Sequence, residues 1–537
     1  MAGMQKTKEI DRAAKKSIAR GAVTVMLAFI ISNIIGLIAK TMTARYYGTS
    51  VESSAFFAAN RFSEILFNLV AGGALGSAFI PVFTGLLVKG EPGKAWKLAS
   101  SIINIVTLVL ILLSILTITS SETVVQYILA PGFDGPQTAL TARLLRIQVL
   151  SSVIFGVSGL LMAILNSHQH FLLPAIAPAM YQLGWIFGII VLSPSMGING
   201  IAWGVVIGAA MHLIVQLPLM SRLDGRSYTF TLGLWMKEVR EVARLMAPRL
   251  LGVAIIQLNF LLNTLLASFQ QEGAITAISL AFPLMIMPEA AIAQSIAIAA
   301  LPTFSALVAQ GKIDEMRQTL VSTLRALLLL AIPASVGLVM LREPIVRVLY
   351  GGQAFGQDSV RLVSWALLWY AVGLVGHSLV EVTSRVFYAL HDTKTPVFIG
   401  VAAMLANLGL SFVFTDLFAR LNWMPHGGLA LANSLATAVE SVFLIIIMRK
   451  RMNGIFGKNI LKATYIALAA STVMGVVIWI TRALLVSWSI VFSTAVSIFV
   501  GMGVYIVVLR LTGTDEVSSL LRMIRSKISL IKNTKKE

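Results

Sequence analysis

A small set of ionisable side chains lies inside the long apolar runs of this sequence, where a charge is costly and therefore informative. Such groups pair with one another, line a polar cavity or take part in function. The basic members could bind an anionic group, and the acidic members could carry protons. The set consists of Lys40, Arg61, Glu64, Arg249, Glu289, Arg325, Glu381, Arg385, Glu440, His212 and His377.

The spacing of the basic groups suggests how they could be used. Arg61 and Glu64 stand three residues apart, which puts them on one helix face where they can form an ion pair. Lys40 lies near one end of its apolar run, and Arg249 follows Pro248 at the start of another. If these basic groups face a common interface, they form an electropositive cavity suited to a phosphate-bearing ligand.

The motifs of common enzyme classes are missing from the sequence. It has no Gly-x-x-x-x-Gly-Lys-Ser/Thr loop for ATP and no His-Glu-x-x-His metal motif. The absence of cysteine excludes disulfides, thiolate metal sites and thiol catalysis. We interpret His168-Gln169-His170, which lacks carboxylate neighbours, as a polar turn at a helix boundary. We therefore expect no catalytic residues, no metal site and no enzyme activity.

The composition indicates that lipid is the main solvent of the elements that carry these groups. Of the 537 residues, 57% are hydrophobic and 12% are charged, whereas a soluble domain carries about 25% charged residues. The formal net charge is +19, and the basic residues cluster in short segments between apolar runs. This pattern is typical of membrane topology, so we expect no nucleic-acid partner.

The apolar runs predict an all-α, polytopic membrane protein. At roughly 20 residues per crossing, fourteen runs are long enough to span a bilayer. The expected spans are 21–44, 55–87, 98–119, 140–166, 171–193, 198–220, 243–269, 274–309, 318–341, 359–390, 396–418, 427–448, 459–482 and 487–510. We interpret the first run as a retained transmembrane helix because so many spans follow it.

The distribution of Lys and Arg predicts that both termini are cytoplasmic. With that orientation most of the 42 basic residues fall in inside segments, as the positive-inside rule requires. The outside loops hold Arg45, Arg143, Arg146, Arg342, Arg347, Arg361, Arg420 and Arg482. Residues 511–537 form a basic, amphipathic tail, which we expect on the inner leaflet.

An internal repeat divides the predicted spans into related halves. A shift of 221 residues places Pro81 on Pro302 and Gly90 on Gly311, and a shift of 222 places Pro174 on Pro396. An even number of helices per half makes the halves enter from the same side, as in parallel-repeat transporters. The expected domains are an N-terminal six-helix lobe (1–220), a C-terminal six-helix lobe (240–450), an accessory helix pair (459–510) and the basic tail (511–537).

Five segments resemble the lipid II flippase family, MurJ/MviN, of the multidrug/oligosaccharidyl-lipid/polysaccharide exporter superfamily. The resemblance covers nearly the whole chain, and that family has the same arrangement of six, six and two helices. The segments are Ala55 to Arg61 (AFFAANR), Gly73 to Pro81 (GALGSAFIP), Leu129 to Phe133 (LAPGF), Phe387 to Pro396 (FYALHDTKTP) and His426 to Ala432 (HGGLALA).

The resemblance implies a function in peptidoglycan and cell-wall biogenesis. Such a flippase moves lipid II, an undecaprenyl-pyrophosphate-linked precursor, from the inner to the outer leaflet of the bacterial cytoplasmic membrane by alternating access. The partners are then a lipid-linked cell-envelope precursor and membrane lipids, and we expect a monomer. No cofactor is expected beyond a coupling ion, Na or H, or the membrane potential.

The chain departs from the family at several basic positions. The first helix has Ser32-Asn33 and then Gly36 to Lys40, where the family usually carries two arginines. The segment Phe282 to Pro288 lacks a further one. The substrate-binding residues that remain are Arg61, Lys40, displaced by one residue, and Arg249, a substitute outside the family pattern.

Two other readings stay open beside the flippase. In the first, the chain is an ion-coupled exporter of another amphiphile or lipid-linked glycan, with Glu64, Glu289 or Glu381 as coupling carboxylates. In the second, it is a membrane scaffold without transport activity. The resemblance also suggests an ion site at Asn263, Asn407 and Asn433, because some family members couple to sodium through polar groups on the seventh, eleventh and twelfth helices.

Overall fold

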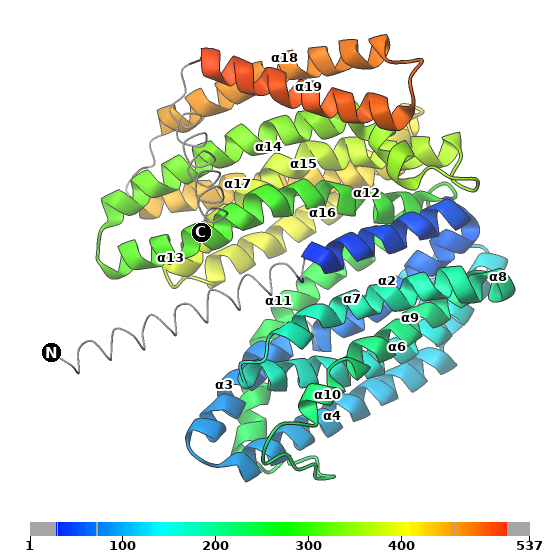
Figure 1. The fold of residues 1–537 in the computed structure, drawn as a ribbon, viewed down its shortest axis with the longest axis vertical. Helices are drawn as coiled ribbons and strands as arrows, with labels where there is room; N and C mark the ends of the chain where they lie inside the picture. The colour runs from blue at the N-terminus through cyan, green and yellow to red at the C-terminus, as the bar shows by residue number, and fades with distance from the viewer. Residues whose placement is uncertain (1–27, 29, 71–73, 453, 455–456, 513–537) are drawn as a thin grey trace, which may run out of the picture. The chain divides into compact units, whose positions relative to one another are not determined.

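The structure is a computed structural model that describes residues 28, 30–70, 74–452, 454 and 457–512. Every regular element in these residues is a helix (Figure 1), which confirms the predicted fold class. Twelve of the helical segments described are long and apolar enough to cross a membrane. The chain is thus a multi-pass membrane protein. Most of the predicted tail, from residue 513 on, and the predicted start of the first span lie outside the described residues.

Contacts divide the chain into two compact units. The first contains the residues up to Thr276 together with Gly352–Phe355, and the second contains Ala277–Gly351 and the residues from Gly356 on. The seventh predicted span therefore packs with the first unit, against α2 and α3. The lobe boundaries that we inferred from the repeat concern sequence similarity, and they stay a prediction.

The first unit is built around long antiparallel helices. A buried apolar cluster from α3, α4 and α6, including Phe79, Phe83, Trp96 and Leu160, forms much of its core. Asp134 caps the start of α6, since its carboxylate accepts a hydrogen bond from the Gln137 amide at 2.8 Å, and Pro136 lies in the first turn. Its helices are the one over residues 30–47, α2 (Val51–Val70), α3 (Ala74–Val88), α4 (Pro92–Thr119), α5 (Ser121–Val124), η1 (Val125–Leu129), α6 (Gly135–Ser167), α7 (Leu172–Phe187), η2 (Gly188–Leu192), α8 (Ser193–Met196), α9 (Ile198–Ile214), α10 (Leu217–Met220) and α11 (Lys237–Ser268).

In the second unit the last two helices pack along α14. Figure 1 shows α18, in orange, and α19, in red, side by side with it. Leu328, Ile332, Ala467 and Met474 are buried in this interface, and the Tyr505 hydroxyl donates to the Leu329 carbonyl at 2.6 Å. The helices are α12 (Ala274–Glu289), η3 (Ala290–Gln294), α13 (Ser295–Ala309), α14 (Ile313–Tyr350), α15 (Gln357–Ala389), α16 (Lys394–Arg420), α17 (His426–Arg451), α18 (Gly457–Leu484) and α19 (Ile490–Leu511).

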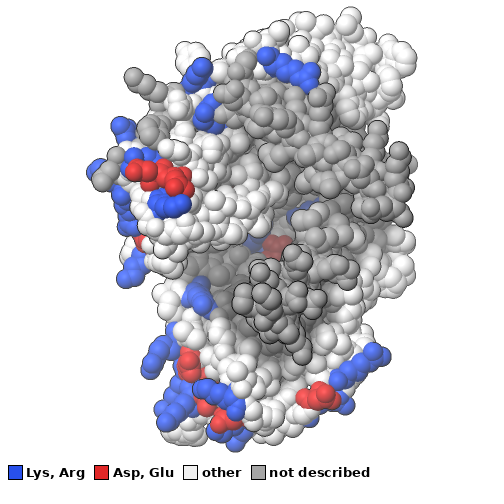
Figure 2. All heavy atoms as spheres, turned by 60° about the vertical axis from the view of Figure 1, so that its left-hand side comes forward, with Lys and Arg blue, Asp and Glu red and all other residues white. Residues whose placement is uncertain are grey.

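Figure 2 shows charged side chains along the left margin and at the lower end of this face, with smaller groups near its upper edge and in its central hollow. Short ion pairs lie near helix ends, for example Lys94 with Glu91 at 3.1 Å and Lys312 with Glu315 at 3.3 Å. This separation of charged ends from apolar sides is expected when the sides of the helices face lipid.

Two pairs of turns repeat the same backbone geometry at the spacing of the sequence repeat. Gly90 and Gly311 both have positive φ, at 74° and 70°, and each accepts the left-handed conformation that favours glycine. Gln169 and His391, 222 residues apart, have φ of 62° and 58°. The amide of the next residue bonds to the carbonyl five residues back in both turns, at 2.9 Å. These equivalent turns support a common origin of the two halves.

Helices α7 and α9 approach closely along a seam of glycines. A Cβ on Gly184 would lie 2.2 Å from the Gly208 Cα, and one on Gly188 would lie 2.6 Å from the Gly204 Cα. Gly184 of α7 and Gly188 at the start of η2 are four residues apart, as are Gly204 and Gly208 of α9. This is the small-residue spacing that brings membrane helices into backbone contact. The seam therefore requires glycine for steric reasons at these four positions.

An extended segment between α10 and α11 lies along α4. The Asn104 amide donates to the carbonyls of Thr229 and Thr231, at 3.2 and 2.9 Å, and the Ser100 hydroxyl accepts from the Thr229 amide at 3.1 Å. This pairing leaves Phe230 and Trp235 92% and 86% exposed. The segment between the two predicted lobes is thus held against α4 and bears exposed aromatic side chains.

Asp392 joins the ends of α15, α16 and α17. Its carboxylate accepts from the Thr395 hydroxyl at 2.5 Å and from the Lys394 and Thr395 amides, and it pairs with Arg451 at 2.6 Å. The Thr395 hydrogen bond, followed by the Thr395 amide and the Arg451 charge, holds the pKa of Asp392 below its ordinary value. The ionised carboxylate is therefore the form that stabilises this junction.

Asp392→Asn should destabilise the protein by about 1 kcal/mol at neutral pH, since Arg451 is half-exposed and the pair is partly screened. A depressed folded pKa stabilises above the unfolded value of about 3.9 and is lost as pH falls through the folded value. The difference in thermal midpoint between variant and parent should stay constant above about pH 5 and close below about pH 4. Asp416→Asn, at an exposed pair with Arg420, is the control.

Candidate functional site

Glu64 of α2 lies on a polar stripe. Asn60, Ser63, Glu64, Phe67 and Asn68 follow one another at helical spacing and line one cavity. Within the stripe, the Glu64 carboxylate accepts from the Asn60 amide at 2.9 Å. An amphipathic face in a membrane helix must meet polar neighbours, and here the facing helices supply them.

Arg61 meets Glu64 from beside this stripe. The Arg61 guanidinium donates to Glu64 Oε2 at 2.7 Å, which confirms the ion pair predicted from their spacing. Its Cζ lies 5.1 Å from the centre of the Phe260 ring of α11, within cation–π range. The Lys40 ammonium is close enough for electrostatic interaction with both Glu64 and Arg61. Three of the predicted residues, two basic and one acidic, thus lie near one another.

The cavity beside Glu64 has a volume of about 400 Å³ and lies wholly within the first unit. Helices α2, α6, α7 and α9 contribute to its wall. Eight of its eleven lining residues carry a polar side chain, although the surrounding helices are apolar. The lining residues are Asn60, Ser63, Glu64, Phe67, Asn68, Ser151, Phe155, Pro178, Tyr181, Gln182 and His212.

The structure does not bring Arg249 into this cluster. Arg249 is exposed on α11, eleven residues before Phe260, which corresponds to about 16 Å along the helix axis. Asn263, one turn beyond Phe260, is buried. Among the three predicted headgroup ligands, Lys40 and Arg61 therefore lie together and Arg249 lies apart.

In the second unit, Glu289 and Glu381 lie near each other. Glu289 is only 5% exposed and accepts a hydrogen bond from the Gln294 amide at 3.3 Å. Glu381 pairs with Arg385 at 2.6 Å, and its charge acts on Glu289. The arrangement is a buried carboxylate beside an ion pair, which could exchange a proton or a cation.

The asparagines of the predicted ion site fall in both units. Asn433, on α17, is buried and its Oδ1 lies 3.1 Å from His377 Nε2 on α15. Asn407 is buried on α16. Asn263 belongs to the first unit, so the proposed joint role of the three residues stays a prediction. In the part of the chain that the structure describes, no group of three or more His, Cys, Asp and Glu could hold a metal ion.

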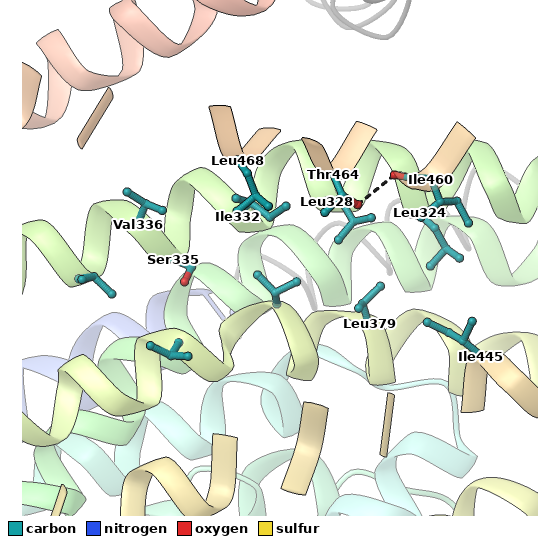
Figure 3. Close-up of a pocket in the computed structure, with 13 residues that line it drawn as sticks. Leu324, Leu328, Ile332, Ser335, Val336, Leu379, Ile445, Ile460, Thr464 and Leu468 are labelled. Carbon is teal, nitrogen blue, oxygen red and sulfur yellow. Dashed lines mark hydrogen bonds between the residues drawn. The ribbon is translucent and has the colours of Figure 1, made fainter. Parts of the chain in front are cut away.

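An apolar groove of about 560 Å³ runs between α14, α15, α17 and α18. Figure 3 shows Leu324, Leu328 and Ile332 of α14 opposite Ile460 and Leu468 of α18. Only Ser335 and Thr464 carry polar side-chain atoms in its lining, and both hydroxyls are bonded to main-chain carbonyls. Such a groove suits a hydrocarbon chain.

Comparison with known proteins decides the family. A sequence profile described as Lipid II flippase MurJ matches residues 43–499. This chain belongs to the MurJ family. A lipid II flippase MurJ of Burkholderia cenocepacia is 28% identical over 80% of this chain and 84% of its own. A probable lipid II flippase MurJ of Rhizobium tropici is 26% identical over 95% of this chain and 97% of its own.

Solved structures agree with this membership of the MurJ family. A lipid II flippase MurJ in an inward closed conformation has a TM-score of 0.78 and 25% identity, over 91% of this chain and 98% of that chain. An inward-facing MATE multidrug transporter has a TM-score of 0.66 at 13% identity, over 80% of this chain and 98% of that chain. The second likeness concerns the fold alone.

Sequence reasoning missed the extent of the polar cavity in this MurJ-family chain. The sequence identifies His212 as an ionisable residue within a span, and it does not indicate that His212 belongs to a site. The cavity could have been predicted from a polar stripe at helical spacing, formed by Asn60, Ser63, Glu64 and Asn68. A search for apolar runs overlooks this stripe because it lies inside one predicted span.

Proposed function

We propose that this chain is a flippase that moves lipid II from the inner to the outer leaflet of the bacterial cytoplasmic membrane by alternating access. The observation that carries the proposal is the MurJ family match over residues 43–499. The relatives with that name span most of this chain, and the fold resembles a solved MurJ structure. We also propose a multi-pass monomer in the inner membrane with both termini cytoplasmic, on the strength of the positive-inside pattern.

The chemistry of an amphiphilic substrate fits features of both units taken separately. The guanidinium of Arg61 and the ammonium of Lys40 can bind a pyrophosphate, and the groove along α14 and α18 can hold a polyprenyl chain. Arg249 stays a candidate for contact with the headgroup at another stage of transport, because it is exposed and basic.

The direct test is rescue of a bacterium depleted of its own lipid II flippase. We expect growth and normal cell shape when this chain is expressed. Loss of rescue at normal membrane abundance would contradict the proposal. An inactive chain of this kind would then fit a membrane scaffold.

A second candidate function is ion-coupled export of another amphiphile. The observation that favours it is Glu289, a 5% exposed carboxylate beside the Glu381–Arg385 pair. This reading predicts that Glu289→Gln abolishes transport of a substrate other than lipid II, and that the chain does not rescue the depleted bacterium.

The groove gives a prediction on the lipid part of the substrate. Leu468→Trp should narrow the groove and lower the rate of lipid II flipping on the order of tenfold, since about 1.4 kcal/mol of lost contact has that effect. Flipping is measured as access of external reagents to lipid II in vesicles. Leu461→Trp is the matched control, because Leu461 is exposed on the same helix but does not line the groove. Equal rates of lipid II flipping for the two variants would show that the groove does not hold the lipid chain during transport.

A further inference from the structure

We propose that the cavity beside Glu64 binds a monovalent metal cation of about the size of sodium, and that this cation competes with Arg61 for the Glu64 carboxylate. The inference rests on the proposed function, because it makes the cation a regulator of the headgroup site. It concerns residues of the first unit only.

Three buried oxygen atoms of the cavity lack a hydrogen-bond partner in the part of the chain that the structure describes. Asn60 is 3% exposed and Ser63 is 4% exposed, and neither Asn60 Oδ1 nor Ser63 Oγ has a hydrogen-bond partner among the described residues. The buried Gln182 Oε1 lacks one too. Each buried acceptor without a donor costs about 1–3 kcal/mol. Three such atoms in one cavity therefore favour a ligand that brings positive charge.

The donor atoms of the cavity determine the kind of ligand that it can bind. Amide carbonyls, a hydroxyl and one carboxylate are oxygen donors, which bind hard cations and not the softer transition metals. A divalent ion is bound through several carboxylates, whereas Glu64 is the single carboxylate in the lining. The donor set is therefore appropriate to a singly charged alkali-metal ion.

His212 lines the cavity but is not a ligand of the cation. Ser158 Oγ accepts from the Gln216 amide at 2.8 Å and lies 2.6 Å from His212 Nδ1. The hydroxyl proton of Ser158 then goes to Nδ1, which we assign as the acceptor from this network. Neutral His212 accordingly carries its proton on Nε2 and is a donor there. Oxygen atoms are left to hold the cation.

The Glu64 carboxylate lies between Arg61 and the cavity that would hold the cation. Arg61 approaches the carboxylate from the side where α11 lies, as its stacking over Phe260 shows. Asn60, Ser63 and Gln182 belong to the cavity. A cation bound in the cavity draws on the same negative charge, so the Arg61–Glu64 pair weakens and the guanidinium becomes available to an anion.

The local charge predicts the sign of the coupling. Arg61 already neutralises Glu64 at 2.7 Å, so a cation alone meets little free negative charge and binds weakly. An anionic headgroup that binds Arg61 frees the Glu64 carboxylate for the cation. Cation and anion should thus strengthen each other's binding, and by linkage the two effects must be equal.

The test uses the purified full-length protein in detergent. Its thermal midpoint is measured while NaCl replaces choline chloride at constant ionic strength and pH, with and without inorganic pyrophosphate. We expect a saturable rise with sodium that needs less sodium when pyrophosphate is present. Absence of a sodium-dependent rise, or a rise that pH alone reproduces, would overturn the proposal.

Variants locate the effect. Ser63→Ala should raise the sodium concentration for half-saturation on the order of tenfold, and Gln182→Met should do the same, since each removes one oxygen ligand. Ser152→Ala is the matched control, because Ser152 Oγ is also buried without a partner on α6 but does not line the cavity. Sodium responses equal to the parent in both lining variants would refute the site.

The outcome is separable from that of the flippase proposal. Failed rescue together with a sodium response that Ser63→Ala weakens rejects lipid II transport and keeps the cation site. Successful rescue without any sodium response does the reverse.

Discussion

Arg61→Ala is expected to abolish rescue of a flippase-depleted bacterium, with a fall in lipid II flipping of about 100-fold or more. The substitution removes the guanidinium that can bind pyrophosphate through two hydrogen bonds. It also leaves Glu64, which is paired at 2.7 Å in the structure, as an uncompensated negative charge near the anion. The two effects act in the same direction, so the expected loss is larger than that of one contact.

The controls for Arg61 separate chemistry from folding. Arg61→Lys keeps the positive charge but loses the planar guanidinium that donates two parallel hydrogen bonds, so it should retain part of the flipping activity. Arg61→Ala combined with Glu64→Gln removes the unpaired carboxylate, and this double variant should reach the membrane at the parent's abundance without transporting lipid II. Arg420→Ala, at an exposed pair near the end of α16, should behave like the parent. Full rescue by Arg61→Ala at equal membrane abundance would show that Arg61 does not bind the headgroup.

Gly184→Val is expected to prevent accumulation of folded protein, with a destabilisation of more than about 3 kcal/mol. The first side-chain atom would lie 2.2 Å from the Gly208 Cα, and a backbone atom cannot turn aside as a side chain can. The helices α7 and α9 would have to separate along the whole seam. Detergent-solubilised yield and thermal midpoint, measured by fluorescence-detected size exclusion, report the loss.

A matched glycine tests whether the seam is the cause. Gly252 lies in α11 with no atom within 4 Å of the position that a Cβ would take. Gly252→Ala should therefore leave the midpoint unchanged or raise it slightly, because alanine favours the helix. A normal midpoint for Gly184→Val would show that α7 and α9 are less tightly packed than the structure indicates.

Features that depend on neighbours in the chain could be predicted from the sequence. The crossings follow from apolar length, and the Arg61–Glu64 pair follows from a spacing of three residues. The turns at Gly90 and Gly311 could be matched because the repeat preserves their residues. In each case the physical cause lies within one helix or one turn.

Features that depend on distant segments could not be predicted. The polar cavity needs α2, α6, α7 and α9 at once, and the apolar groove needs α14, α15, α17 and α18. Arg249 illustrates the same limit, because its basic character suggested a place beside Arg61, yet it is exposed about three helical turns from Phe260. Side-chain type indicates which chemistry is available, while packing decides which groups meet.

The repeated turns also provide a means of observing the protein at work. Lys89 and Gln310 occupy equivalent, exposed positions just before Gly90 and Gly311, and the sequence contains no cysteine. A cysteine introduced at each of these two positions would carry a spin label or a fluorophore without competition from a native thiol. The distance between the two labels would then compare the same structural point in each half throughout a transport cycle.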